Sequence, residues 1–90
     1  MATVVLILKI MPESPATDLE AIKKAARANL ELEGARNITF EERPIAFGLK
    51  AVIMKTDMPE DKGTDLVEAK LSGITGVSSV TIEDYRRAFG

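Results

Sequence analysis

The 90-residue sequence contains no cysteine, no histidine and no tryptophan, and its aromatic residues are one tyrosine and three phenylalanines. Zinc and copper sites normally draw on Cys or His ligands, so a metal site of that kind is not expected. A Ser–His–Asp triad, a Cys–His dyad and a histidine general base are excluded. Carboxylates, lysines and the tyrosine remain as groups that could act in catalysis, and no disulfide can stabilise the fold.

The sequence also carries little net charge and no long hydrophobic run. Twelve Lys and Arg residues against fourteen Asp and Glu residues give a formal charge of −2, shared equally by the two halves of the chain. Without a basic stripe, we expect no direct binding to nucleic acid. Lys9 interrupts the apolar start, so we expect no signal peptide and no membrane span. Together with the missing cysteines, this pattern predicts a cytoplasmic protein of one domain.

Four segments have the composition of β-strands. Thr3–Ile10 and Ala46–Lys55 are largely apolar on both faces, which is typical of strands in the middle of a sheet. Asn37–Arg43 and Val77–Tyr85 alternate between apolar and polar residues, which suits edge strands. Pro44 predicts a short hairpin connection between the second and third strands.

Two segments have the pattern of helices. Thr17–Glu33 begins with a possible capping box of Thr17 and Glu20, and Gly34 is expected to end it in the left-handed conformation. A polar loop, 57–63, is expected before a second helix, with Thr64 or Asp65 as its cap. The residues of this segment expected to face inward are Val67, Leu71 and Ile74.

The order strand, helix, strand, strand, helix, strand predicts an α+β fold. Right-handed crossovers place both helices on the same face of the sheet. We therefore expect a ferredoxin-like two-layer sandwich, βαββαβ, with a four-stranded antiparallel sheet. That topology places the first and third strands in the centre of the sheet. Their apolar composition predicts the same position independently.

The sequence does not contain the residues that several functions of this fold require. Met11–Ser14 holds no cysteine pair for a trafficked metal, and the central strands lack the aromatic residues that would stack RNA bases. A loop with Asp57, Glu60 and Asp61 could hold Mg²⁺ or Ca²⁺, but its spacing matches no calcium loop, and we interpret it as a solvated loop. Glu41 and Glu42 are adjacent on a strand and point to opposite faces, so they cannot form a catalytic pair.

Two features are candidates for a binding function. Phe47-Gly48 directly follows the Pro44 turn; by position alone we expect Phe47 to pack in the core, because aromatic residues are usually buried. The tail Tyr85–Phe89 combines aromatic and basic residues, and such tails are usually frayed and inert. The alternative is that an exposed aromatic and this tail form edges of a protein-binding surface.

Three stretches carry a resemblance to a known family: Ile45–Ala51, Lys62–Glu68 and Gly76–Val80. With them the whole chain resembles the archaeal translation elongation factor 1-beta family, and it is similar to the C-terminal exchange domain of the eukaryotic factor. This resemblance implies a guanine-nucleotide exchange factor for the GTPase elongation factor 1-alpha, with residues 1–90 forming one exchange domain. It implies neither an enzyme nor a cofactor.

The resemblance also implies contact residues. In the eukaryotic relatives an aromatic residue in a Gly-aromatic-Gly turn wedges into the GTPase; Phe47 and Gly48 occupy those positions here, and Ala46 replaces the first glycine. A lysine near the eukaryotic C-terminus disturbs the magnesium site, and Arg87 lies nearest to it by count. We therefore expect partner-binding residues in two groups, which are Ala46, Phe47 and Gly48, and Tyr85, Arg86 and Arg87.

The leading hypothesis is thus an exchange factor that promotes GDP release and GTP reloading on elongation factor 1-alpha and is a monomer when free. The alternative is a small-molecule-sensing regulatory domain of ferredoxin-like fold, acting as a dimer through its sheet edges. A single-stranded RNA binder is disfavoured by the central strands and by the charge. Exchange requires no general base or nucleophile, so the missing side chains do not argue against it.

Overall fold

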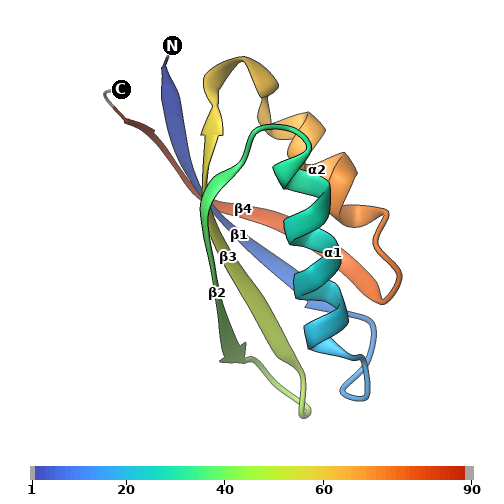
Figure 1. The fold of residues 1–90 in the computed structure, drawn as a ribbon. Helices are drawn as coiled ribbons and strands as arrows, with labels where there is room; N and C mark the ends of the chain where they lie inside the picture. Colours follow the sequence, from blue (N-terminus) through green and yellow to red (C-terminus); the bar gives the residue numbers. More distant parts are fainter. Residues whose placement is uncertain (1, 89–90) are drawn as a thin grey trace.

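The computed structural model describes residues 2–88, which form a four-stranded sheet covered by helices (Figure 1). No helix within these residues has the length and apolar character needed to span a membrane. The elements in chain order are β1 (Thr3–Pro12), α1 (Leu19–Glu31), β2 (Arg36–Pro44), β3 (Lys50–Pro59), the 3-10 helix η1 (Glu60–Lys62), α2 (Thr64–Ser72) and β4 (Val77–Ala88).

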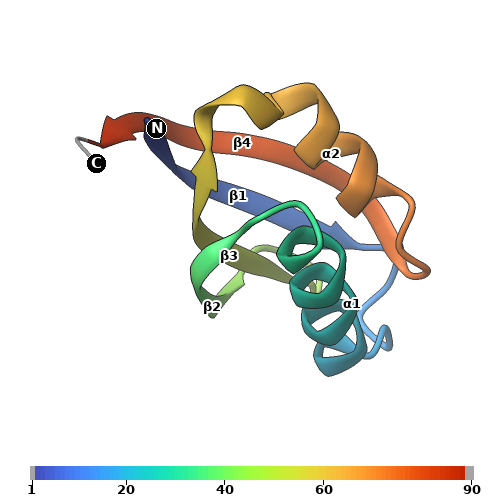
Figure 2. The ribbon, with the colours of Figure 1, turned by 45° about the horizontal axis from the view of Figure 1, so that its top comes forward.

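The strands lie in the order β2-β3-β1-β4, and every neighbouring pair is antiparallel. Both helices pack on the same face of the sheet (Figures 1 and 2). This is the predicted ferredoxin-like sandwich, and β1 and β3 occupy the two central places as their composition indicated. The fold class is therefore confirmed.

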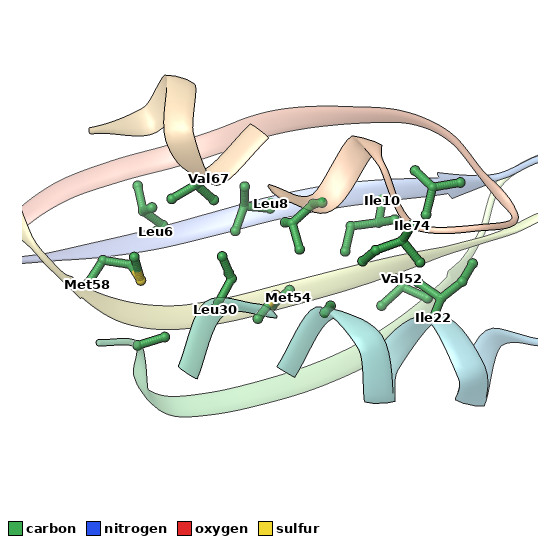
Figure 3. Packing of buried hydrophobic residues seen from close by; sticks show 14 of the residues in the cluster. Leu6, Leu8, Ile10, Ile22, Leu30, Val52, Met54, Met58, Val67 and Ile74 are labelled. Atoms are coloured by element: carbon green, nitrogen blue, oxygen red, sulfur yellow. The ribbon is translucent and has the colours of Figure 1, made fainter. Parts of the chain in front are cut away.

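The core lies between the sheet and the helices. Alternate residues of β1 and β3 point toward the helices, because successive side chains of a strand point to opposite faces. Each fully buried aliphatic side chain contributes about 1.5–3 kcal/mol relative to an exposed one. The labelled side chains of Figure 3 are Leu6, Leu8, Ile10, Ile22, Leu30, Val52, Met54, Met58, Val67 and Ile74.

The opposite face of the sheet is covered in part by an ion pair. Arg43 of β2 lies directly across from Ala51 and therefore shares its face, away from the helices. Its guanidinium donates to the Glu83 carboxylate of β4 at 3.0 and 3.2 Å. Because β2 and β4 are the two edge strands, this pair crosses the central strands, and Ala51 and Ile53 there are buried.

All four strands extend beyond their predicted limits, β2 by one residue at each end. β3 begins at Lys50 rather than Ala46 and continues to Pro59, through residues that the polar sequence assigned to a loop. The extension is stable because Asp57, Met58 and Pro59 lie opposite the first residues of β1. β1 itself continues to Pro12, whose missing N–H is tolerated at the strand end, where the register with β4 shifts.

Both predicted helix caps are wrong. The α1 cap is Asp18, whose Oδ1 accepts from the amides of Glu20 and Ala21 at 3.0 and 3.2 Å. Thr17 is used instead inside the preceding loop, where its hydroxyl accepts from the Ser14 amide. The α2 cap is Gly63, with a φ of 72° and no side-chain cap bond, so neither Thr64 nor Asp65 has that role.

The end of the chain forms more regular structure than expected. β4 continues to Ala88, so Tyr85, Arg86 and Arg87 belong to a strand paired with β1 and not to a frayed tail. Glu83 is an extra residue in this pairing, since Ile7 lies opposite Asp84 and Leu8 opposite Ile82. Phe89, the last residue of the predicted tail, lies outside the described residues.

Candidate functional site

The connection between β2 and β3 is a tight turn with an unusual backbone. The Leu49 amide donates to the Ala46 carbonyl at 2.9 Å, and the Ile45 amide donates to the Leu49 carbonyl at the same distance. The two central residues, Phe47 and Gly48, have φ values of 55° and 79°. Two consecutive positive φ angles closed by this bond define a type I′ turn, whose twist matches that of the flanking strands.

Phe47 is exposed to solvent, contrary to the place in the core that its position alone indicated, and is therefore accessible to a partner. Its exposed fraction is 95%, whereas Phe40, six residues before the turn proper on β2, packs against the core with the Arg27 guanidinium 5.5 Å from its ring centre. The left-handed conformation is costly for a residue with a Cβ, by about 1–2 kcal/mol. An aromatic side chain that is both strained and exposed gains little from burial, which makes Phe47 a candidate for a binding residue.

The neighbours of Phe47 explain the geometry of the turn. The second left-handed position of the turn is not strained, because it is occupied by Gly48 and glycine tolerates positive φ. Ala46 does not share the positive φ of the two central residues, so a glycine is not required there. Pro15, in the loop between β1 and α1, lies beside the turn: a Cβ on Gly48 would be 3.7 Å from the Pro15 Cβ.

An ion pair lies beneath the same end of the hairpin. Lys23 of α1 donates to the Glu42 carboxylate of β2 at 2.8 Å and to Glu20 at 3.1 Å. The hydrogen bond from Lys23 lowers the pKa of Glu42 below its usual value, and the bond to Glu42 raises the pKa of Lys23. Glu42, Gly48 and Pro15 are among the residues that line a small hollow of about 170 Å³.

The C-terminal candidates lie on both faces of β4. Tyr85 and Arg87 are opposite Leu6 and Val4, so they share the helix side of the sheet, whereas Arg86 is opposite Val5 on the other side. Tyr85 is 48% exposed.

Both arginines have carboxylate partners within the chain. Arg87 pairs with Glu60 of η1, which raises the pKa of the guanidinium further above its usual value, and Arg86 pairs with Asp84 at 2.9 Å. These ion pairs are exposed, so water and salt compete with them. Both guanidinium groups are therefore accessible to a partner.

The two groups of candidate residues lie at opposite ends of the sheet. Val52 of β3 is opposite Ile10, and Arg87 is opposite Val4, so six residues of β1 separate their levels, about 20 Å along the strand. The turn lies beyond Val52, at the end of the molecule opposite the start of β1 and the end of β4 (Figure 1). The candidate residues thus form two separate groups and not one continuous patch.

The carboxylate groups of the described residues are not arranged for metal binding. No three acidic side chains within residues 2–88 lie close enough to hold an ion. Asp57 accepts from the Asn37 side chain at 2.7 Å and Glu60 is paired with Arg87, so two members of the loop cluster have protein partners. Glu41 and Glu42 lie opposite Ile53 and Val52, on different faces of the sheet, as predicted.

The contacts made by Lys23, Pro15 and Glu60 were not identified from the sequence. Each joins segments far apart in the chain; Lys23 and Glu42 are 19 residues apart, and Glu60 and Arg87 are 27 apart. No local spacing rule signals such a pair. The hairpin itself was predicted, but its turn was misplaced at Pro44: Pro44 is the last residue of β2, and the turn lies at Ala46–Leu49, where the sequence predicted the start of a strand.

Comparison with known proteins supports a common family. Residues 5–88 match the family described as the EF-1 guanine nucleotide exchange domain. The chain is 44% identical to an elongation factor 1-beta of Methanothermobacter thermautotrophicus, and the match covers 97% of this chain and 98% of that protein. Another elongation factor 1-beta, from Metallosphaera sedula, is 40% identical, with 97% of each chain covered.

Proposed function

Because this chain belongs to the family of EF-1 guanine nucleotide exchange domains, we propose that it promotes GDP release and GTP reloading on elongation factor 1-alpha. The observation that carries the proposal is Phe47, an exposed aromatic residue held in a strained turn at the tip of a hairpin. Residues 1–90 act as one exchange domain, and the protein is a monomer when free.

The proposed mechanism is differential binding. An exchange factor accelerates GDP release when it binds the nucleotide-free GTPase more tightly than the GDP-bound form. GDP is held by a phosphate loop and by Mg²⁺ on the GTPase. A rigid protrusion that fits only the opened GTPase supplies the required difference without forming or breaking a covalent bond, so the protein needs no catalytic side chain.

The two ends of the sheet have different roles in this proposal. At one end, Phe47 inserts into the GTPase, because it is the most exposed large apolar side chain among residues 2–88 and its backbone is fixed by two hydrogen bonds. At the other end, the positive charges of Arg86 and Arg87 can compete with Mg²⁺ for the negatively charged groups that surround the nucleotide phosphates. The two regions are about 20 Å apart along the sheet, so a partner that touches both must have a surface at least that long.

Release of a fluorescent GDP analogue from elongation factor 1-alpha tests the proposal. We expect micromolar protein to accelerate release in a saturable manner, and Phe47→Ala to slow the accelerated rate at least about tenfold, since a buried aromatic contact is worth on the order of 2 kcal/mol or more. Lys24→Gln, at an exposed position of α1 with no ion pair among the described side chains, serves as the control. No acceleration by the unmodified protein would overturn the proposal, and ligand-dependent dimerisation in its place would favour the regulatory alternative.

A further inference from the structure

The tip of the β2–β3 hairpin projects beyond the last residues at which β3 is paired with β1. β1 pairs with β3 from Pro59 as far as Val52, and the residues of β3 before Val52 are paired with β2. The turn with Phe47 therefore lies on a two-stranded extension, and two-stranded ribbons are only marginally stable by themselves. The direction in which Phe47 points depends on what supports this extension from the side.

Lys23 supports the hairpin at the base of the extension. Its partner Glu42 lies directly opposite Val52, the level at which the pairing of β3 with β1 stops. The Lys23 Nζ is 2.8 Å from the Glu42 carboxylate, and only 18% of the Lys23 side chain is exposed. A partly shielded pair of this kind is screened less by salt than a fully exposed one.

The same lysine is fixed on a rigid element. Lys23 also pairs with Glu20, one turn earlier on α1, at 3.1 Å. α1 is anchored by Ile22 and Ala26, which are buried against the sheet. The ion pair therefore joins the hairpin to a helix that is packed on the core, whereas Pro15 lies beside the tip on a loop.

We propose that Lys23 is a positioning residue for the exchange reaction, which acts through Glu42 to hold the hairpin tip and Phe47 at a fixed angle to the body. This inference rests on the proposed function. Lys23 need not touch the GTPase, because its ammonium group is directed to Glu42 of β2 and its side chain is mostly shielded from solvent. Loss of the pair leaves Phe47 in place but widens the range of directions that it samples.

The first test measures the turn in the free protein. Phe47→Trp introduces the chain's sole tryptophan, since the sequence has none, and its fluorescence anisotropy reports the motion of the tip. In this background we expect Lys23→Gln and Glu42→Gln to lower the anisotropy. Lys24→Gln is the matched control, because Lys24 is the next residue on the same helix, is exposed and has no ion pair among the described side chains. Equal anisotropy in all variants would overturn the proposal.

The second test separates positioning from binding. With unmodified Phe47, we expect Lys23→Gln and Glu42→Gln each to lower the saturating rate of GDP release about three- to tenfold and to change the half-saturating concentration less than about twofold. The double variant should be no slower than either single one, because both changes remove the same pair. Lys23→Arg should restore most of the rate, and Lys24→Gln should match the unmodified protein.

The contrary outcomes are distinct. If Glu42→Gln raises the half-saturating concentration while Lys23→Gln has no effect, Glu42 contacts the GTPase directly and the positioning role is wrong. If the losses of the two single variants add in the double variant, the residues act independently and the proposal is also wrong. If the unmodified protein gives no exchange at all, the proposed function fails, whereas the anisotropy measurement still shows whether the pair holds the tip.

Discussion

At the scale of single residues, Phe47 combines two properties that folding alone does not favour. Its side chain is 95% exposed and its φ is 55°, so it gains little from burial and carries backbone strain. The sequence indicated a hairpin connection at Pro44, but aromatic residues are usually buried, and position alone predicted a buried Phe47; only the family resemblance pointed to an exposed one. The exposure follows from the hairpin extending past the core, which is a tertiary property.

The strain at Phe47 predicts a trade-off between stability and exchange. Phe47→Asn creates an Asn-Gly pair, the preferred sequence of a type I′ turn. We expect the free energy of unfolding, measured with urea, to rise by about 1 kcal/mol, because asparagine tolerates the left-handed conformation. The accelerated rate of GDP release should fall in the same variant. A loss of stability would show that the Phe47 side chain packs against the fold.

The Lys23–Glu42 pair predicts a pH dependence. The pKa of Glu42 lies below its usual value of 4.5 in the folded protein, so the pair's contribution to stability is complete above that value and is lost as the pH falls through the folded pKa. We expect the difference in unfolding free energy between the unmodified protein and Lys23→Gln to be constant from about pH 6 to pH 8 and to vanish in acid. Carboxyl NMR should show the Glu42 pKa rising in Lys23→Gln; an unchanged pKa would contradict the contact.

At the scale of elements, the apolar patterning predicted the strands and helices but not where they end. β3 and β4 continue through polar residues because β1 lies opposite and supplies backbone hydrogen bonds to them. Polar composition favours loops only when no neighbouring strand is available. The caps failed for a related reason, since Thr17 and Asp18 are both good caps and the loop bond of Thr17 to Ser14 decides between them.

The pairing of β4 with β1 predicts that the C-terminal residues serve two roles. Deleting residues 86–90 removes the strand opposite Val4 and Val5, so we expect a loss of about 1–2 kcal/mol in the free energy of unfolding as well as slower exchange. Arg86→Gln combined with Arg87→Gln keeps the strand and removes the charge. That variant should be nearly as stable as the unmodified protein and slow in exchange; full exchange activity would exclude a role for the two arginines.

At the scale of the whole molecule, the sheet sets the distance between the two candidate contact regions. The sequence predicted the topology, because the two most apolar strands must be central, and it proposed two groups of candidate contact residues. It could not predict that they lie at opposite ends, since that depends on the register of β1 with both neighbours. The architecture fits a factor that touches a larger protein at two places and changes its hold on a ligand.

The proposed mechanism requires that this protein bind the nucleotide-free form of elongation factor 1-alpha more tightly than the GDP-bound form. Calorimetric titration of both forms with the protein measures this difference most directly. We predict a dissociation constant at least about tenfold lower for the nucleotide-free form, with the dissociation constant of GDP raised by the same factor when the protein is saturating, because linkage is reciprocal. Equal affinity for the two forms would exclude exchange by differential binding.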